Sequence, residues 1–90
     1  MPNRLDALLM EIADLLRVGG HERWAVTFDR FRAQALADMV GAKVDILGVY
    51  GAAGSFNDIV LHREGHALLE ENERLNAARE ELWRLCRSSS

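Results

Sequence analysis

The residues with the clearest chemical potential lie in the stretch VYGAAGSFNDIV, residues 49–60. Closely spaced glycines precede a group of polar residues there, and the set is Gly48, Gly51, Gly54, Ser55, Asn57 and Asp58. A phosphate-binding P-loop needs a lysine after its glycines and a strand before them, and this stretch has neither. Ser55 also lacks the Gly-x-Ser-x-Gly setting of a nucleophile. The stretch therefore predicts neither an enzyme nor a bound cofactor.

Ser55 and Asp58 instead have the spacing of a capping box, which would begin a short helix. In that motif the serine side chain accepts a hydrogen bond from the backbone near Asp58, and the carboxylate reaches back. Aromatic residues beside such a turn either pack it onto the helices or anchor a partner. We expect an ordered corner with a structural or interaction role, formed by Tyr50, Ser55, Phe56, Asn57 and Asp58.

Two histidines have the spacing of a metal site. His62 and His66 are four residues apart, and on a helix they would share one face, as zinc ligands do. Gly65 lies between them, however, and no third ligand stands at a matching distance in the sequence. We therefore expect exposed turn residues here and no metal.

The segment ALADMVGAKVDIL, residues 35–47, resembles the skeleton of a helix-turn-helix. Its second helix would offer only Lys43 and Asp45 to base edges, and it also contains Gly48. The chain has a net charge of −3, whereas DNA binding requires neutralisation of phosphates. We interpret the segment as two packed helices joined at Gly41, and we expect no binding to nucleic acid.

Apolar periodicity predicts an all-α fold, a small bundle of about four helices in one domain over residues 1–90. The first helix carries leucines at helical spacing, and Gly19 and Gly20 end it. Residues 56–63 could form either a short helix or an extended segment, because Ile59 and Val60 are β-branched. The corner would pin the third helix to the last. The expected helices span residues 4–18, 21–40, 42–50 and 67–86.

Length and composition indicate the size class of the protein and its expected location in the cell. Ninety residues with 49% apolar content suit one small globular domain. Cys86 is the single cysteine, so no internal disulfide can form, and we expect a cytoplasmic protein. The N-terminus has acidic residues within its apolar pattern, unlike a secretory signal. The longest apolar region, residues 46–56, is too short to cross a bilayer, so no membrane association is expected.

The central stretch also resembles the signature of a family of short bacterial proteins of unknown function. That signature reads approximately Tyr-Gly-Gly-x-Gly-Ser-Phe-Asn-Asp-Leu-Val-Leu. The chain departs from it at Ala52, where the family tends to have glycine, and conservatively at Ile59. The resemblance supports the fold and implies no activity. The matching residues are Tyr50, Gly51, Gly54, Ser55, Phe56, Asn57, Asp58, Val60 and Leu61.

These observations favour a non-enzymatic protein-binding domain. The most concrete form is a bacterial immunity or antitoxin-like protein that blocks a partner, and a basic partner would suit the acidic chain. One alternative is a small-ligand-binding or enzymatic domain that uses the loop of residues 50–58. Another is a homodimer formed through the apolar third helix and Trp83.

Overall fold

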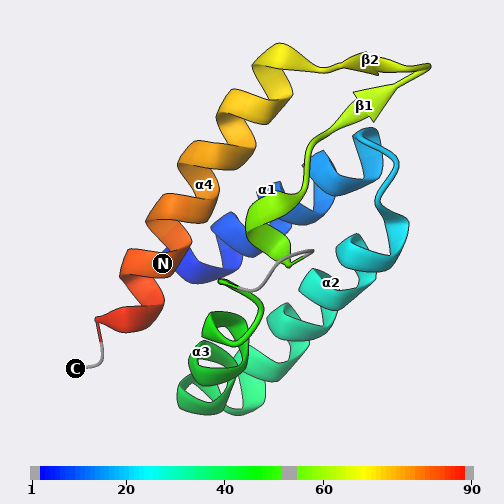
Figure 1. Ribbon diagram of the computed structural model, residues 1–90. Helices are drawn as coiled ribbons and strands as arrows, with labels where there is room; N and C mark the ends of the chain where they lie inside the picture. The colour runs from blue at the N-terminus through cyan, green and yellow to red at the C-terminus, as the bar shows by residue number, and fades with distance from the viewer. Residues whose placement is uncertain (1–2, 52–54, 89–90) are drawn as a thin grey trace.

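The computed structural model describes residues 3–51 and 55–88, and within them it has four α-helices that form a small bundle. Helix α1 packs against both α2 and α4, and α3 closes one end against α2 and α4 (Figure 1). The predicted all-α bundle is confirmed. The elements in chain order are α1 (Arg4–Val18), α2 (Glu22–Ala37), α3 (Met39–Leu47), a 3₁₀ turn (Phe56–Asp58), β1 (His62–Arg63), β2 (His66–Ala67) and α4 (Leu69–Arg87).

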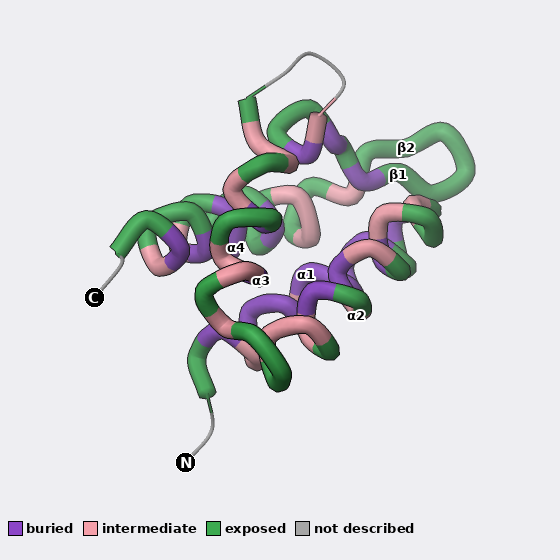
Figure 2. The backbone as a smooth tube through the Cα atoms, turned by 90° about the horizontal axis from the view of Figure 1, so that it is seen from below, coloured by how far each residue is buried: buried purple, intermediate pink, exposed green. Residues whose placement is uncertain are grey.

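Helix α1 is the central element of the core, and its bounds agree with the sequence pattern. The side chain of Asn3 caps its start by accepting a hydrogen bond from the backbone N–H of Leu5 at 2.9 Å. At its end, the N–H of His21 donates to the carbonyl of Leu16 at 2.8 Å, while Gly20 adopts a φ of +84°. This is the Schellman arrangement, which requires a left-handed residue that glycine supplies without strain. Figure 2 shows the buried positions concentrated along α1.

The break between the second and third helices lies at Asp38, not at Gly41 as the sequence suggested. Asp38 leaves helical geometry, with φ −152° and ψ 86°, and its Oδ1 accepts from the Gly41 N–H at 2.9 Å. An aspartate N-cap therefore begins α3 three residues early, and α3 ends at Leu47 instead of residue 50. A Cβ at Gly41 would lie 2.1 Å from Asp38 Oδ2, so the glycine makes room for the cap. One residue is also shorter than the three to four residues of a DNA-binding helix-turn-helix connection.

The predicted capping box at Ser55 and Asp58 is wrong. The Ser55 side chain makes no capping bond, and the N–H of Asp58 donates to the Ser55 backbone carbonyl at 3.0 Å. A single turn of 3₁₀ helix already satisfies this donor through the backbone, so the serine hydroxyl has no role there. The glycine-rich centre of the expected corner, residues 52–54, lies outside the described part of the chain.

Residues 56–63 combine the two predicted alternatives: Phe56–Asp58 form the 3₁₀ turn, and residues 59–63 are extended and continue into a hairpin. Glu64 and Gly65 both have positive φ, at 52° and 80°, as a two-residue type I′ turn requires. His62 pairs with Ala67, and His66 pairs with Arg63. The two histidines are therefore on opposite faces of the ribbon, where they cannot share a metal as they would on a helix. The hairpin also delays the start of α4 from residue 67 to Leu69.

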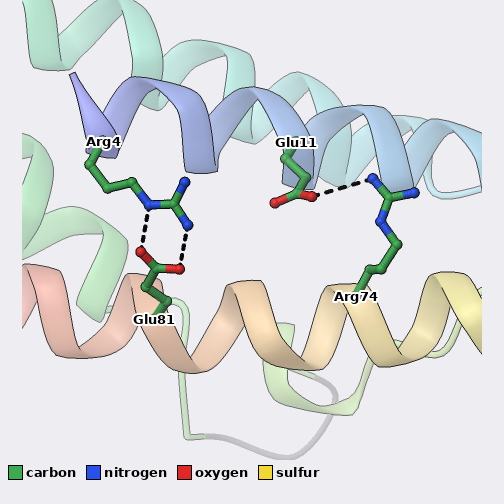
Figure 3. A network of polar contacts seen from close by, with 4 residues as sticks. All are labelled: Arg4, Glu11, Arg74 and Glu81. Carbon is green, nitrogen blue, oxygen red and sulfur yellow. Dashed lines mark hydrogen bonds and ion pairs between the residues drawn. The ribbon is translucent and has the colours of Figure 1, made fainter. Parts of the chain in front are cut away.

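Helices α1 and α4 run antiparallel, and two ion pairs connect them (Figure 3). The Arg4 guanidinium forms a two-point bond to the Glu81 carboxylate, with both distances at 2.5 Å. Two turns further along α1, Glu11 pairs with Arg74 at 3.3 Å. These contacts show the register in which α1 lies against α4.

Candidate functional site

Helix α4 carries two polar residues on the face that packs against the rest of the protein. Its inward stripe advances by steps of four and three, so Asn72 and Arg79 alternate with leucines there. Both residues hold the segment of residues 56–61, which contains part of the predicted corner. The full stripe is Leu68, Asn72, Leu75, Arg79, Leu82 and Cys86.

Arg79 is the buried charged residue in the described part of the chain, with only 9% of its surface exposed. Its Nη1 donates to the carbonyl oxygens of Phe56 at 2.7 Å and of Ile59 at 3.1 Å. Its Nη2 donates to the side-chain oxygen of Asn76, and the guanidinium lies 5.5 Å from the centre of the Phe56 ring. Burial lowers the pKa of Arg79, and the nearby Tyr50 and Asp58 oppose that shift. The guanidinium therefore serves as a fixed donor that holds the corner.

Asn72 binds the next part of the same segment through both atoms of its amide. Its Oδ1 accepts from the N–H of Leu61 at 2.7 Å, and its Nδ2 donates to the carbonyl of Leu61 at 3.0 Å. The N–H of Leu68 also donates to the Leu61 carbonyl at 3.0 Å. An asparagine on α4 thus pairs with the extended backbone as a neighbouring strand would.

The two aromatic residues of the predicted corner belong to the core. The Phe56 side chain is fully buried, with its ring centre 4.6 Å from that of Phe28 and 5.8 Å from that of Trp24. Tyr50 meets Phe56 edge to face at 5.4 Å, and its hydroxyl donates to the Arg79 carbonyl at 2.8 Å. Burial raises the pKa of Tyr50, so this phenol stays protonated. These contacts give Tyr50 and Phe56 a structural role in the corner.

The three polar residues of the corner are placed differently from one another. The Ser55 hydroxyl is buried and has no hydrogen-bond partner among the residues that the structure describes. Asn57 is exposed and lines a surface hollow of about 600 Å³ between the corner and α4, together with Trp83. Asp58 is exposed and lines a second hollow beside His21, whose Nε2 lies 2.9 Å from the carbonyl of Val60. Ser55 lines this second hollow together with Asp58, whereas Asn57 lies at the first, so the structure brings two of the three residues to one place.

The arrangement offers hydrogen bonding and apolar contact more than acid–base chemistry. The hydroxyls of Ser55 and Tyr50 are buried or already bonded, and burial raises the pKa of the Cys86 thiol. In the described residues, no cluster of three or more histidine, cysteine, aspartate or glutamate side chains could hold a metal ion.

A strip of apolar side chains lies exposed at the end of the bundle formed by α2 and α3. Leu36 is 87% exposed, Val40 75% and Val44 64%, and the three follow at intervals of four residues. Val40 and Val44 share one side of α3, and that side carries no charged residue. Lys43 borders it on one edge and Asp45 on the other. We refer to Leu36, Val40 and Val44 as the α3 strip. Leu36 and Val40 lie on either side of the helix break at Asp38.

Comparison with known protein families places the corner, the α3 strip and the hairpin within one family domain. A family described as a domain of unknown function (DUF6966) matches residues 17–69. The chain belongs to this family. The DUF6966 segment contains α2, α3, the α3 strip and the hairpin, and it ends where α4 begins. Asn72 and Arg79, which hold the corner, therefore lie just beyond it.

Searches of the curated proteins and of the solved structures found no match. Within the described residues, no helix combines the length and the apolar character that crossing a membrane would need.

Proposed function

We propose that this DUF6966 protein is a non-enzymatic protein-binding domain that docks a partner protein on the α3 strip. Its most specific form is an immunity or antitoxin-like protein that blocks the partner. The observation that carries the proposal is the exposure of Leu36, Val40 and Val44, at 87%, 75% and 64%. Highly exposed apolar side chains near one another in the sequence of a small domain are typical of an interaction site, because water is excluded from them only when a partner covers them.

Burial of the α3 strip by a partner would release a free energy typical of the centre of a protein–protein interface. Full burial of a leucine or valine side chain is worth about 1.5–3 kcal/mol, so covering the strip contributes roughly 5 kcal/mol. Association itself opposes binding by about 4 kcal/mol or more. The strip therefore needs the partner's own apolar side chains and a polar rim, and Lys43 and Asp45 lie at its two edges.

The corner supports this proposal better than it supports a ligand-binding or catalytic role. Phe56 is fully buried, and the Tyr50 hydroxyl is bonded to a backbone carbonyl of α4. Both residues stiffen the connection between α3 and α4, which fixes the orientation of the strip relative to the bundle.

The proposal can be tested by site-directed photocrosslinking in the native host. A photoreactive residue at Val40 is compared with one at Leu69, which is 77% exposed but outside the strip. We expect an adduct with a distinct protein at position 40 and none at 69. The captured protein is then purified; it should bind the wild type and Leu69→Glu equally, and Val40→Glu should lose that binding.

Two outcomes would contradict the proposal. An adduct at position 40 of only twice the mass of the chain would assign the strip to a homodimer. A partner that binds Val40→Glu as tightly as the wild type would place the interface elsewhere. The antitoxin form makes a further prediction: the partner expressed alone should slow growth, and co-expression of the wild type, but not Val40→Glu, should restore it.

A further inference from the structure

A separate apolar hollow of about 380 Å³ lies between α1 and the first half of α4. Its apolar lining comes from one side of α1, where Met10 is 45% exposed and Val18 is 40% exposed. Glu71 and Arg74 of α4 form the opposite wall. None of its lining residues belongs to the α3 strip, so it is a second surface with its own chemistry. The residues on its α1 side are Ala7, Met10, Glu11, Asp14, Leu15 and Val18.

The charges around this hollow are unbalanced. In the antiparallel register of Figure 3, Arg4 faces Glu81 and Glu11 faces Arg74. One further turn of each helix brings Asp14 to the level of Glu71, and both carboxylates line the hollow where the earlier positions pair opposite charges.

Within the described residues, neither Asp14 nor Glu71 forms an ion pair. Arg32 attracts Asp14 electrostatically, but it is already bound by Asp6 at 2.9 Å. Because Glu11 pairs with Arg74, the hollow combines the apolar side chains of Met10, Leu15 and Val18 with two carboxylates that form no ion pair in the described residues.

We propose that this hollow binds an amphipathic helix of a partner protein that carries lysine or arginine beside its apolar face. The apolar side chains of that helix would cover Met10 and Val18, and a cationic side chain would lie between Asp14 and Glu71. In helix-in-groove docking, apolar side chains at helical spacing on the bound helix insert into the groove. The two carboxylates of the hollow favour a basic helix over an acidic one. The proposal deepens the proposed protein-binding function by naming the chemistry of a partner segment, and it concerns a different surface from the α3 strip.

The test uses two designed helical peptides that differ only in charge. Both have leucines along one face; one has lysines on the flanks of that face and the other has glutamates. Each is titrated into protein with isotope-labelled methyl groups, and binding is followed by NMR. We expect the lysine peptide to shift the methyl signals of Met10 and Val18, with affinity that falls as salt is raised. The glutamate peptide should leave these signals unchanged.

A pair of matched variants isolates the role of the two carboxylates. Asp14→Asn with Glu71→Gln should weaken binding of the lysine peptide by roughly three- to tenfold, since exposed ion pairs contribute little each. Glu64→Gln with Glu73→Gln removes the same charge from exposed sites outside the hollow and should change affinity by less than about twofold. Circular dichroism of both double variants confirms that the fold is retained.

Several results would overturn the proposal: equal binding of both peptides, equal weakening by both double variants, or no shift at Met10 and Val18 at millimolar lysine peptide. The experiment is repeated in the Val40→Glu background, which removes the α3 strip. Loss of peptide binding only in that background would move the site to the strip. If the lysine peptide does not bind this hollow, the proposed docking of a partner on the α3 strip is unaffected. If no partner docks on the α3 strip, the proposed binding of a basic helix in this hollow is unaffected.

Discussion

Replacement of Arg79 by methionine is the sharpest test of how the corner is held. Methionine retains most of the length and apolar volume of the side chain but removes every donor. The carbonyls of Phe56 and Ile59 would then lose the Nη1 donor, both residues are buried, and the Phe56 carbonyl would keep only a long bond of 3.4 Å from the Ile59 N–H. A buried carbonyl left without a donor costs about 1–3 kcal/mol. Release of the guanidinium from its buried site offsets part of that loss. We expect the free energy of unfolding to fall by about 3 kcal/mol.

The assay is thermal and urea unfolding followed by circular dichroism. For a domain of this size each 1 kcal/mol shifts Tm by about 4–8 °C, so Arg79→Met should melt roughly 12–24 °C below the wild type. Arg84→Met is the matched control, because Arg84 lies on the same helix and pairs with Glu80 at 3.7 Å on an exposed surface. Its expected loss is less than about 1 kcal/mol. The loss of stability in Arg79→Lys should lie between those of Arg79→Met and Arg84→Met, since one ammonium cannot replace the forked donors of a guanidinium.

One result would refute this reasoning. If Arg79→Met is as stable as the wild type, the desolvation of the guanidinium cancels its hydrogen bonds, and the residue does not stabilise the corner. The near-ultraviolet signal provides an independent readout, because Trp24 packs against Phe56. Loss of that signal with unchanged stability would indicate that Arg79 orders the aromatic cluster without contributing net free energy.

Three further predictions follow from single contacts. Asn72→Asp should lower Tm by several degrees at neutral pH, because its carboxylate would face the Leu61 carbonyl without a donor; unchanged Tm would mean that water replaces the amide. Gly19→Ala should lower the free energy of unfolding by about 1–3 kcal/mol through overpacking, since a Cβ there would lie 2.4 Å from Leu61 Cδ2. A variant with the urea midpoint of the wild type would contradict this close approach. Arg32 holds the pKa of Asp6 below 3.8, so this carboxylate stabilises the fold above that pH and the contribution disappears as pH falls through the lower native pKa. Asp6→Asn should therefore show a shallower loss of stability on acidification, and a parallel pH profile would exclude the effect.

The helices could be predicted from the sequence because apolar periodicity determines which faces are buried. Helix α1 follows its leucine stripe and ends at the glycine pair that the pattern indicated. The boundary between α2 and α3 was missed because Gly41 is the more conspicuous helix breaker. The N-capping bond of Asp38 decides the boundary, and Gly41 is the residue that accommodates it.

The corner shows where sequence patterns stop being informative. The importance of Tyr50 and Phe56 was visible, but their polar partner Arg79 comes from α4, 29 and 23 residues further along the chain. Asn72 and Arg79 carried a usable signal, since both lie on the apolar stripe at positions where leucine would be expected. A polar residue on a buried stripe predicts a bonded partner, although it does not reveal which backbone group the partner will be.

Asn72 and Arg79 also determine the register of α4 against the corner. Leu68, Leu75 and Leu82 repeat every seven residues, so an α4 shifted by one heptad would still present leucines to the core. Such a shift would place Asn72 where Arg79 now reaches two carbonyls, and its shorter side chain could not span that distance. The polar pair therefore distinguishes the native register from its apolar neighbour. If so, replacing both residues by leucine should leave a helical and compact protein whose aromatic environment around Phe56 is heterogeneous, with several NMR signals for each methyl group of Leu61. A single, sharp set of signals in that double variant would show that the apolar contacts alone fix α4 against the corner.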